Sequence, residues 1–550
     1  MSFLLWLLIA VTGNTATFDA VLRGALVVDG SGGPGRKADV GLKGDRIAKV
    51  GTIPPGQGRE WDLTGLVLAP GFVDMLGQSD FSLLVDPRAA SKLLMGVTTE
   101  ISGEGNSAAP LDDRMVREKQ EAYAPLGLTI DWKTFPQYLA RLDRAGIGIN
   151  FGSYIGATNL RKIHVGWDNV SATPAQLKAM AQDVTDAIRA GAFGVSSALQ
   201  YTPGRFADTA EMVELAKAAG AMGAIYATHQ RSEGDQWESS LAEVFDIARR
   251  AGVQTEIFHL KTAYAKNWGK MPQVVARIEK ARAQGLRVSA NIYPYAAAAS
   301  GLTACLPPWL LEGGMEKTLE RLNVAELRAR AAAEIQKRAH GWENFYTGSG
   351  GAEGILLSQI HDPGLSVWEG KRLSELSKAQ RKSPVDALLD LIIADRGRTT
   401  AVFFLMAEKD VRKALKTPWV TFGTDSGARA LDGPLKDDRG HPRAWGSFAR
   451  VLGRYVREEK LVKLESAIAR MTSVPAERMG LIKRGLVREG NYADLVAFNA
   501  QTIRDRSTFE QPQAYAEGVQ FVWVNGRPAV EKGKLTAERA GRVLRFAPAQ

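Results

Sequence analysis

The sequence is poor in the residues that build thiolate sites, because its 550 residues include a single cysteine, Cys305. One cysteine cannot form an intramolecular disulfide, and it excludes a metal site made from a cysteine cluster. Histidine is also scarce, with six residues. A histidine-based metal site therefore has few places in this chain.

A long apolar run is missing from the N-terminus. Residues 3–11 are all apolar, but this segment is too short to span a bilayer. The length matches the apolar region of a signal peptide, and Gly13 and Ala16 offer small residues for cleavage, although the usual positive charge before the run is absent. We predict a signal peptide over residues 1–16 and export to the periplasm or medium. A cytoplasmic protein is the alternative if the run is not a signal.

The sequence also has no run of Lys and Arg with interleaved aromatic residues. Its net charge is +10, with 70 Lys and Arg against 60 Asp and Glu, but the basic residues are scattered. This pattern argues against a nucleic-acid partner and favours a basic surface or an anionic small substrate. The oligomeric state is left open.

The chain is long enough for more than one domain. Short β-branched runs broken by glycine occur over residues 18–51 and return over residues 493–526, so we predict one small β-sandwich built from residues 17–69 and 485–550. Between them, strand-like runs, one of which is residues 401–404, alternate with helical patterns, which predicts an α/β fold with a parallel sheet. Residues 70–484 fit a (β/α)8 TIM-like barrel with an inserted cap around residues 305–345. A doubly wound open sheet is the alternative, but no Gly-rich phosphate loop follows an early strand.

Three polar residues end strand-like runs in this central region. They are His229, His259 and Asp425, and in a barrel the carboxyl ends of the strands carry the active site. Glu104, in a Gly-rich turn, completes a His2Glu set of the kind that binds catalytic zinc. Each residue alone has an ordinary structural interpretation: a hydrogen-bonded core histidine, or a solvated loop carboxylate for Glu104.

Further candidates lie near these strand ends. Arg443 offers a planar fork suited to a carboxylate, and His441 lies two residues before it. Tyr293 and Tyr295 follow a strand-like run, so one of the two phenols is expected to face the pocket and the other to pack. A structural ion pair is the alternative for Arg443.

Several motifs along the chain point to one family. They are GVTTEISGEG at 96–105, SSALQYTPG at 196–204, THQRSE at 228–233, FHLK at 258–261, YPY at 293–295, FGTDSG at 422–427, HPRAWGSF at 441–448 and the tail TSVPAERMGL with EGNYADLVAF. Together they resemble the N-acyl-D-amino-acid deacylases (D-aminoacylases) of the amidohydrolase superfamily. The resemblance implies a metal-dependent hydrolase barrel that cleaves the acyl amide of an N-acyl-D-amino acid through a zinc-activated water.

The resemblance also implies roles for residues. His229 and His259 match metal-binding histidines, and Asp425 matches the aspartate that handles the proton. Residues expected to contact the substrate are Tyr293, Arg443, Lys261, Gln78 and His441.

The chain departs from the family at three positions. Glu104 stands where a metal-binding cysteine is more common, and Leu76 and Gln78 stand where the family has a His-x-His pair. A carboxylate keeps the charge and donor character of a thiolate, whereas leucine cannot coordinate. We therefore predict one divalent metal, with zinc favoured, and a small carboxylated amide as the substrate.

Three alternatives stay open. In the first, the substrate is another carboxylated amide, such as a D-amino-acid-containing dipeptide or a cyclic imide. In the second, the protein is a non-catalytic binding protein on the same fold. In the third, Gln78 and Asp80 recruit a weakly held second ion.

Overall fold

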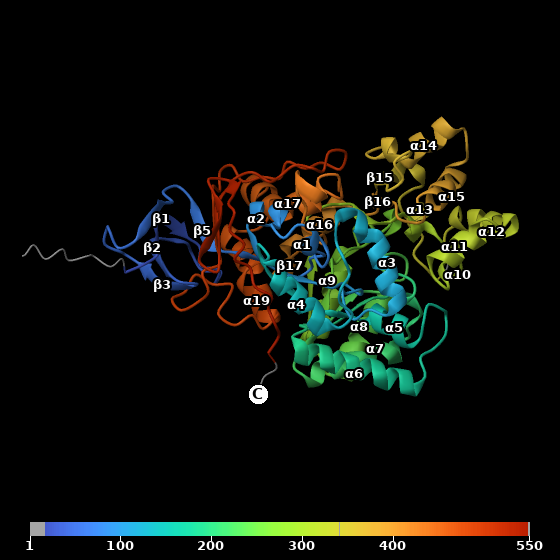
Figure 1. Cartoon of the computed structure of the whole chain (residues 1–550), viewed down its shortest axis with the longest axis horizontal. Coiled ribbons are helices and arrows are strands. Elements are labelled where there is room, and N and C mark those ends of the chain that lie inside the picture. The colour runs from blue at the N-terminus through green and yellow to red at the C-terminus, as the bar shows by residue number, and fades with distance from the viewer. Residues whose placement is uncertain (1–16, 340, 548–550) are drawn as a thin grey trace, which may run out of the picture.

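The computed structural model describes residues 17–339 and 341–547. The predicted signal peptide lies outside the described residues. Figure 1 shows a β-rich end, a central barrel and a projecting insertion.

Strands from both ends of the chain form one nine-stranded sheet. Its central contact is between β5 and β18, which pair antiparallel and so join the two ends of the chain. The sheet encloses its own apolar core, in which Trp61 of β4 lies edge-on to Trp523 of β19. The strands are β1 (Ala20–Val27), β2 (Arg36–Lys43), β3 (Arg46–Gly51), β4 (Arg59–Asp62), β5 (Val67–Pro70), β18 (Leu495–Phe498), β19 (Val519–Val524), β20 (Arg527–Glu531) and β21 (Lys534–Leu535).

The central strands are parallel and close into a barrel. They run in the order β6-β7-β8 and β9-β10-β11-β12-β13-β17, and only Tyr154 separates β8 from β9. A parallel bridge between Gly77 and Ser426 joins the end of β6 to the end of β17 and completes the ring. The strands are β6 (Phe72–Asp74), β7 (Val97–Ser102), β8 (Asn150–Ser153), β9 (Ile155–Gly156), β10 (Gly194–Ala198), β11 (Ile225–His229), β12 (Thr255–Ile257), β13 (Val288–Ile292) and β17 (Val420–Phe422).

Helices cover the outside of this ring. In α6, Thr173 and Gln176 form a capping box and Pro174 occupies the first turn, so the helix start is fixed by local sequence. The barrel-region helices are α1 (Ser82–Val85), α2 (Ala90–Leu94), α3 (Asp113–Tyr123), α4 (Phe135–Ala145), α5 (Ala157–His164), α6 (Pro174–Ala190), α7 (Thr209–Ala221), α8 (Trp237–Ala251), α9 (Met271–Ala283), α16 (Glu408–Lys416), α17 (Arg443–Arg450), α18 (Leu464–Met471) and α19 (Ser473–Arg478). The predicted α/β barrel class is confirmed.

The insertion between β13 and β17 is larger than the expected cap at residues 305–345. It contains the antiparallel sheet β14-β16-β15, and the apolar run at 401–404, which the alternation suggested for the barrel, belongs to β16 of this sheet. Its elements are β14 (Ala298–Gly301), α10 (Pro308–Leu311), α11 (Met315–Leu322), α12 (Ala325–Ile335), α13 (Phe345–Gly348), β15 (Ile355–Gln359), α14 (Leu373–Gln380), α15 (Pro384–Ala394) and β16 (Thr400–Phe403).

The C-terminal segment also differs from expectation. Sequence reasoning placed residues 485–550 in the β domain, but Leu544 donates its backbone N–H to Phe151 of β8, and Phe546 donates to Gly191 after α6. The chain therefore returns to the barrel after β21.

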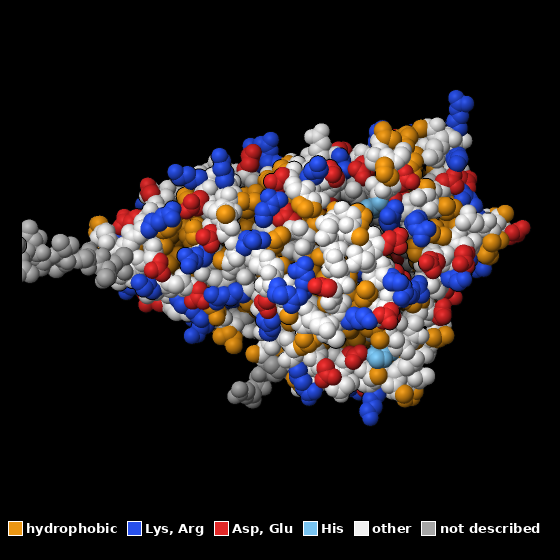
Figure 2. Space-filling model, viewed as in Figure 1, with side chains coloured by type: hydrophobic (Ala, Val, Ile, Leu, Met, Phe, Trp, Pro, Cys, Tyr) orange, Lys and Arg blue, Asp and Glu red, His pale blue; other side chains and the backbone are white. Residues whose placement is uncertain are grey.

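Charged residues of both signs share the surface. Figure 2 shows Lys and Arg interspersed with Asp and Glu over the face in view. No helix within the described residues combines the length and apolar character needed to cross a membrane.

Candidate metal and catalytic site

Four of the predicted site residues come together at the carboxyl ends of the barrel strands. His229 is the last residue of β11, His259 follows β12, Glu104 follows β7 and Asp425 follows β17. All four line one cavity of about 840 Å³. One wall of this cavity comes from the insertion, through residues of β14, β15 and β16.

Two of these residues have left-handed backbone conformations. The φ angles are 34° at His259 and 50° at Asp425, where a non-glycine residue costs of order 1–3 kcal/mol. Backbone contacts hold both positions: His259 donates its N–H to the Asn291 side chain at 2.8 Å, and Asp425 donates to the Leu76 carbonyl at 2.8 Å. The fold thus stabilises two unfavourable conformations that place these side chains.

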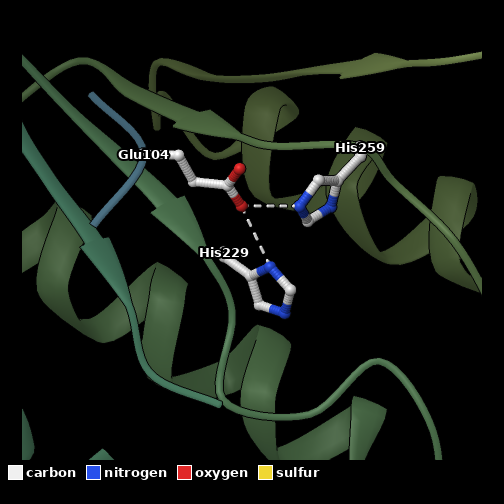
Figure 3. Close-up of side chains that lie close together, drawn as sticks. All are labelled: Glu104, His229 and His259. Atoms are coloured by element: carbon white, nitrogen blue, oxygen red, sulfur yellow. Dashed lines mark hydrogen bonds and ion pairs between the residues drawn. The ribbon is translucent and has the colours of Figure 1, made fainter. Parts of the chain in front are cut away.

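Glu104, His229 and His259 converge on one point. His259 Nε2 lies 2.7 Å and His229 Nδ1 lies 3.0 Å from the same oxygen, Oε1 of Glu104 (Figure 3). One potential ligand atom from each residue lies within 4.8 Å of the others. Two imidazoles and a carboxylate form one of the known catalytic zinc sets, so the residues present fit a divalent ion.

The outer nitrogen of each imidazole has a polar partner of its own. His229 Nε2 lies 3.0 Å from Gln200 Oε1, and His259 Nδ1 lies 3.0 Å from Glu233 Oε1. Without an ion, the inner nitrogens donate to Glu104. With an ion bound beside Glu104, donation from the outer nitrogens would leave a lone pair on each inner nitrogen for the ion. Such partners fix the tautomer that a ligating histidine needs.

The charges in this cluster shift the ionisation of its members. Burial lowers the pKa of His229, whereas the Glu104 and Glu233 carboxylates overcome burial and raise the pKa of His259 to about 9. Despite burial, the facing imidazoles hold the pKa of Glu104 well below its usual range. Glu104 is therefore an ionised carboxylate, as a metal ligand must be.

Asp425 is held through both carboxylate oxygens. Arg443 Nη1 lies 2.6 Å from Oδ2, and Gln78 Nε2 donates to Oδ1 at 2.8 Å. Burial outweighs Arg443 and raises the pKa of Asp425 to about 7. A carboxylate with such a pKa can take and return a proton near neutral pH.

The predicted substrate contacts fall into two groups. Arg443, Lys261, Tyr293 and Gln78 line the cavity, and the Arg443 guanidinium lies over the Tyr293 ring, 4.7 Å from its centroid. His441 also lines it, but both ring nitrogens contact backbone: Nδ1 accepts from the Arg443 N–H at 2.9 Å, and Nε2 lies 3.1 Å from the Ala297 carbonyl. His441 therefore has no free nitrogen for a substrate, contrary to expectation, and instead positions Arg443.

Glu233 and Gln200 contact the two imidazoles of the candidate site, and sequence reasoning did not assign either residue. Lys261 Nζ contacts Glu233 at 2.7 Å, and the lysine lowers the pKa of this carboxyl against the effect of burial. Glu233 therefore contacts both Lys261 and His259, and its Oε2 lies 3.7 Å from His229 Nε2. Its position four residues after His229, in the motif THQRSE, was the available signal.

The place of the missing His-x-His pair is filled in two ways. Leu76 is 1% exposed and packs with Met75 and Ile101 in the barrel interior, so it offers no donor. Gln78 faces the cavity, but Asp80 does not line it. The arrangement needed for an ion between Gln78 and Asp80 is not present.

Comparison with known proteins assigns the chain to a family. Residues 346–530 match the family model described as "Amidohydrolase family". The N-acyl-D-glutamate deacylase of Alcaligenes xylosoxydans xylosoxydans is 34% identical over 529 residues, 96% of each chain, and the D-aminoacylase of the same organism is 33% identical over 96% of this chain and 98% of its own. The chain belongs to the D-aminoacylase family of amidohydrolases.

Solved structures of D-aminoacylase family members agree with this assignment. The N-acyl-D-glutamate deacylase of Bordetella bronchiseptica, solved with zinc and a phosphonate inhibitor, has a TM-score of 0.81 at 32% identity, over 96% of this chain and all of that one. A D-aminoacylase structure, described as having a binuclear metal centre with one-metal activation and second-metal attenuation, has a TM-score of 0.79 at 33% identity over the same shares. The predicted resemblance is confirmed.

Proposed function

We propose that the protein hydrolyses the acyl amide bond of N-acyl-D-amino acids at a single divalent ion held by Glu104, His229 and His259. The observation that carries the proposal is the convergence of two imidazoles and a carboxylate on one point, with Asp425 beside them in the same cavity. The names of the relatives, which are N-acyl-D-glutamate deacylase, D-aminoacylase and N-acyl-D-aspartate deacylase, support the substrate class. Zinc is the favoured ion because a zinc complex of a 32% identical relative is known.

The proton route follows from the position of Asp425. When bound, the ion lowers the pKa of a coordinated water and polarises the scissile carbonyl. The Asp425 carboxylate takes the proton of the attacking water as the new C–O bond forms. It then returns that proton to the amide nitrogen as the C–N bond breaks, which releases the acid and the amine.

A substrate carboxylate fits the cationic side of the cavity. Arg443 uses Nη1 for Asp425, and its buried Nε has no hydrogen-bond partner within the described residues. Lys261 supplies a second cation, with its Nζ 5.5 Å from the centroid of the Tyr293 ring. Because Arg443 contacts Asp425 directly, a carboxylate bound to this arginine would bring the amide of the substrate close to the proton acceptor.

The size of the cavity supports a second candidate substrate. About 840 Å³ is in the upper part of the range for small-molecule pockets and exceeds what a short N-acyl amino acid fills. A D-amino-acid-containing dipeptide, or its N-acyl derivative, uses the same chemistry and occupies more of this space.

The experiment combines turnover with metal content on one sample. Purified protein is incubated with N-acetyl-D-amino acids, their L enantiomers, short dipeptides containing a D-residue and a cyclic imide, and zinc is measured after dialysis. We expect one equivalent of zinc and turnover of D but not L substrates. Zinc-loaded protein that cleaves none of the amides refutes the hydrolase, and two tightly held equivalents refute the single ion.

Export is a separate proposal, which rests on the apolar N-terminal run alone. N-terminal sequencing of protein from the periplasm or the medium tests it, because cleavage is expected by residue 16.

A further inference from the structure

Gln78 lies between the two carboxylates of the site. Its Nε2 is 3.1 Å from Oε2 of Glu104 and 2.8 Å from Oδ1 of Asp425. Glu104 is a candidate metal ligand and Asp425 is the candidate proton acceptor. One side-chain nitrogen therefore connects the metal-binding and proton-transfer parts of the site.

The donors and acceptors around the Gln78 side-chain amide determine its orientation. Ionised carboxylates only accept hydrogen bonds, so the NH2 group of Gln78 must face both of them and its carbonyl oxygen must face away. Each N–H of the group then has one acceptor. A position between two carboxylate oxygens suits either a double donor of this kind or a cation.

The backbone at Gln78 is held from both neighbouring strands. Gln78 donates its N–H to the Ser426 carbonyl at 3.2 Å, and Gly77 donates to Ile101 at 3.0 Å. A Cβ at Gly77 would lie 2.1 Å from the Glu100 carboxyl carbon, so this close approach requires glycine. The amide is consequently presented from a rigid part of the barrel, at the junction that closes the ring.

The bridge also determines how Asp425 is oriented. Arg443 holds Oδ2 and Gln78 holds Oδ1, so rotation of the carboxylate would break one contact or the other. Without Gln78, Oδ1 and Glu104 Oε2 would face each other with no donor between them. Repulsion between the two charges would then turn Asp425 away from the point on which the imidazoles converge.

We propose that Gln78 is a positioning residue whose amide holds Asp425 beside Glu104 and occupies the place that a second ion would need. This inference rests on the proposed function for its kinetic consequence. Its structural consequence, a site complete with one ion, is measured independently of turnover.

The test uses zinc-loaded full-length protein and three substitutions of Gln78. Gln78→Met keeps the length and removes both donors, Gln78→Asn keeps the amide on a shorter stem, and Gln78→Glu keeps the shape but adds a carboxylate. Gln273→Met, on the exposed face of α9, is the matched control. The readouts are kcat and KM on the best N-acyl-D-amino acid, zinc equivalents under excess zinc, and the urea midpoint.

We expect Gln78→Met to lower kcat at least tenfold with KM within threefold, one zinc equivalent and an unchanged urea midpoint. Gln78→Asn should recover part of kcat, and the control should match wild type. Gln78→Glu places three carboxylates together and should raise zinc binding to two equivalents. These outcomes together support the proposal.

Other outcomes overturn it. A Gln78→Met protein with kcat within twofold of wild type shows that the bridge does not position Asp425. A Gln78→Glu protein that still binds one equivalent shows that the amide does not stand in the place of an ion. If wild-type protein cleaves no N-acyl-D-amino acid, the proposed function fails, while the zinc counts still decide whether Gln78 occupies an ion's place.

Discussion

Replacement of Lys92 by methionine tests whether a buried cation stabilises the strand ends that carry the site, including the segment around Asp425. Lys92 is fully buried, and its Nζ contacts Asp74 at 2.8 Å, Glu100 at 2.9 Å, the Thr424 hydroxyl at 2.7 Å and the Ser426 carbonyl at 2.8 Å. Lys92→Met keeps the apolar stem and removes the ammonium. Two buried carboxylates then lose their common cation, and the residues on either side of Asp425 lose a donor.

The expected cost follows from the burial of the cluster. Removal of one partner from a buried ion pair costs about 3–5 kcal/mol, because an uncompensated charge remains. Total stabilities are about 5–15 kcal/mol, so the variant should unfold at a clearly lower urea concentration. A second change, Lys92→Met with Glu100→Gln, removes one of the stranded charges and should recover part of the loss.

The loss should also depend on pH. In the variant the folded-state pKa of Asp74, already raised by burial against the effect of Lys92, rises further. When a carboxyl has a higher pKa in the folded state than in the unfolded state, the protein loses stability as pH rises. The deficit relative to wild type should therefore be larger at pH 8 than at pH 5.

Urea unfolding followed by circular dichroism at the two pH values measures this. Lys178→Met, at an exposed lysine of α6, is the control and should leave the midpoint unchanged. A cost below about 1 kcal/mol for Lys92→Met, or an equal cost at both pH values, would contradict the role assigned to the ammonium.

Three further predictions follow from the site and its surroundings. Gly77→Ala forces a Cβ to within 2.1 Å of Glu100 and should cost about 1–3 kcal/mol, measured as a fall in the thermal midpoint, whereas Gly33→Ala, with its nearest neighbour at 3.3 Å, should not. Asp425→Asn should lower kcat by about 100-fold or more with the zinc content unchanged, and near-normal turnover would remove the proton-transfer role. Burial and Glu100 raise the pKa of Asp80 from 3.8 to about 7, so wild type should lose stability as pH rises through this window. The Asp80→Asn variant should not show that loss. If the urea midpoints of the two proteins change in parallel from pH 4.5 to 8, the assigned role of Asp80 is refuted.

Residues at strand ends were predictable from the sequence because the barrel brings those ends together. His229, His259 and Asp425 each close or follow a buried strand-like run, and parallel strands in a ring direct such residues to one mouth. Glu104 was predictable from the glycines around it, since they allow a close approach of the backbone. Local sequence was sufficient for these four.

Other features depend on contacts that the local sequence does not encode. The pairing of Gln200 with His229, and of Gln78 with two carboxylates, results from loop conformations set by distant strands. The run at 401–404 was assigned to the barrel. Its apolar pattern is the same for a buried strand of the barrel and for a buried strand of an inserted antiparallel sheet. His441 was expected to bind substrate. The sequence alone does not show that backbone groups contact both of its ring nitrogens.

The pairing of β5 with β18 has a consequence for synthesis of the chain. The N-terminal strands leave the ribosome first, but the partner of β5 is made only after the whole barrel. Until then β5 presents an open edge, the kind of surface on which nascent chains associate with one another. A chain that terminates early would keep that edge open however well its barrel folded, so completion of the sheet marks a full-length molecule.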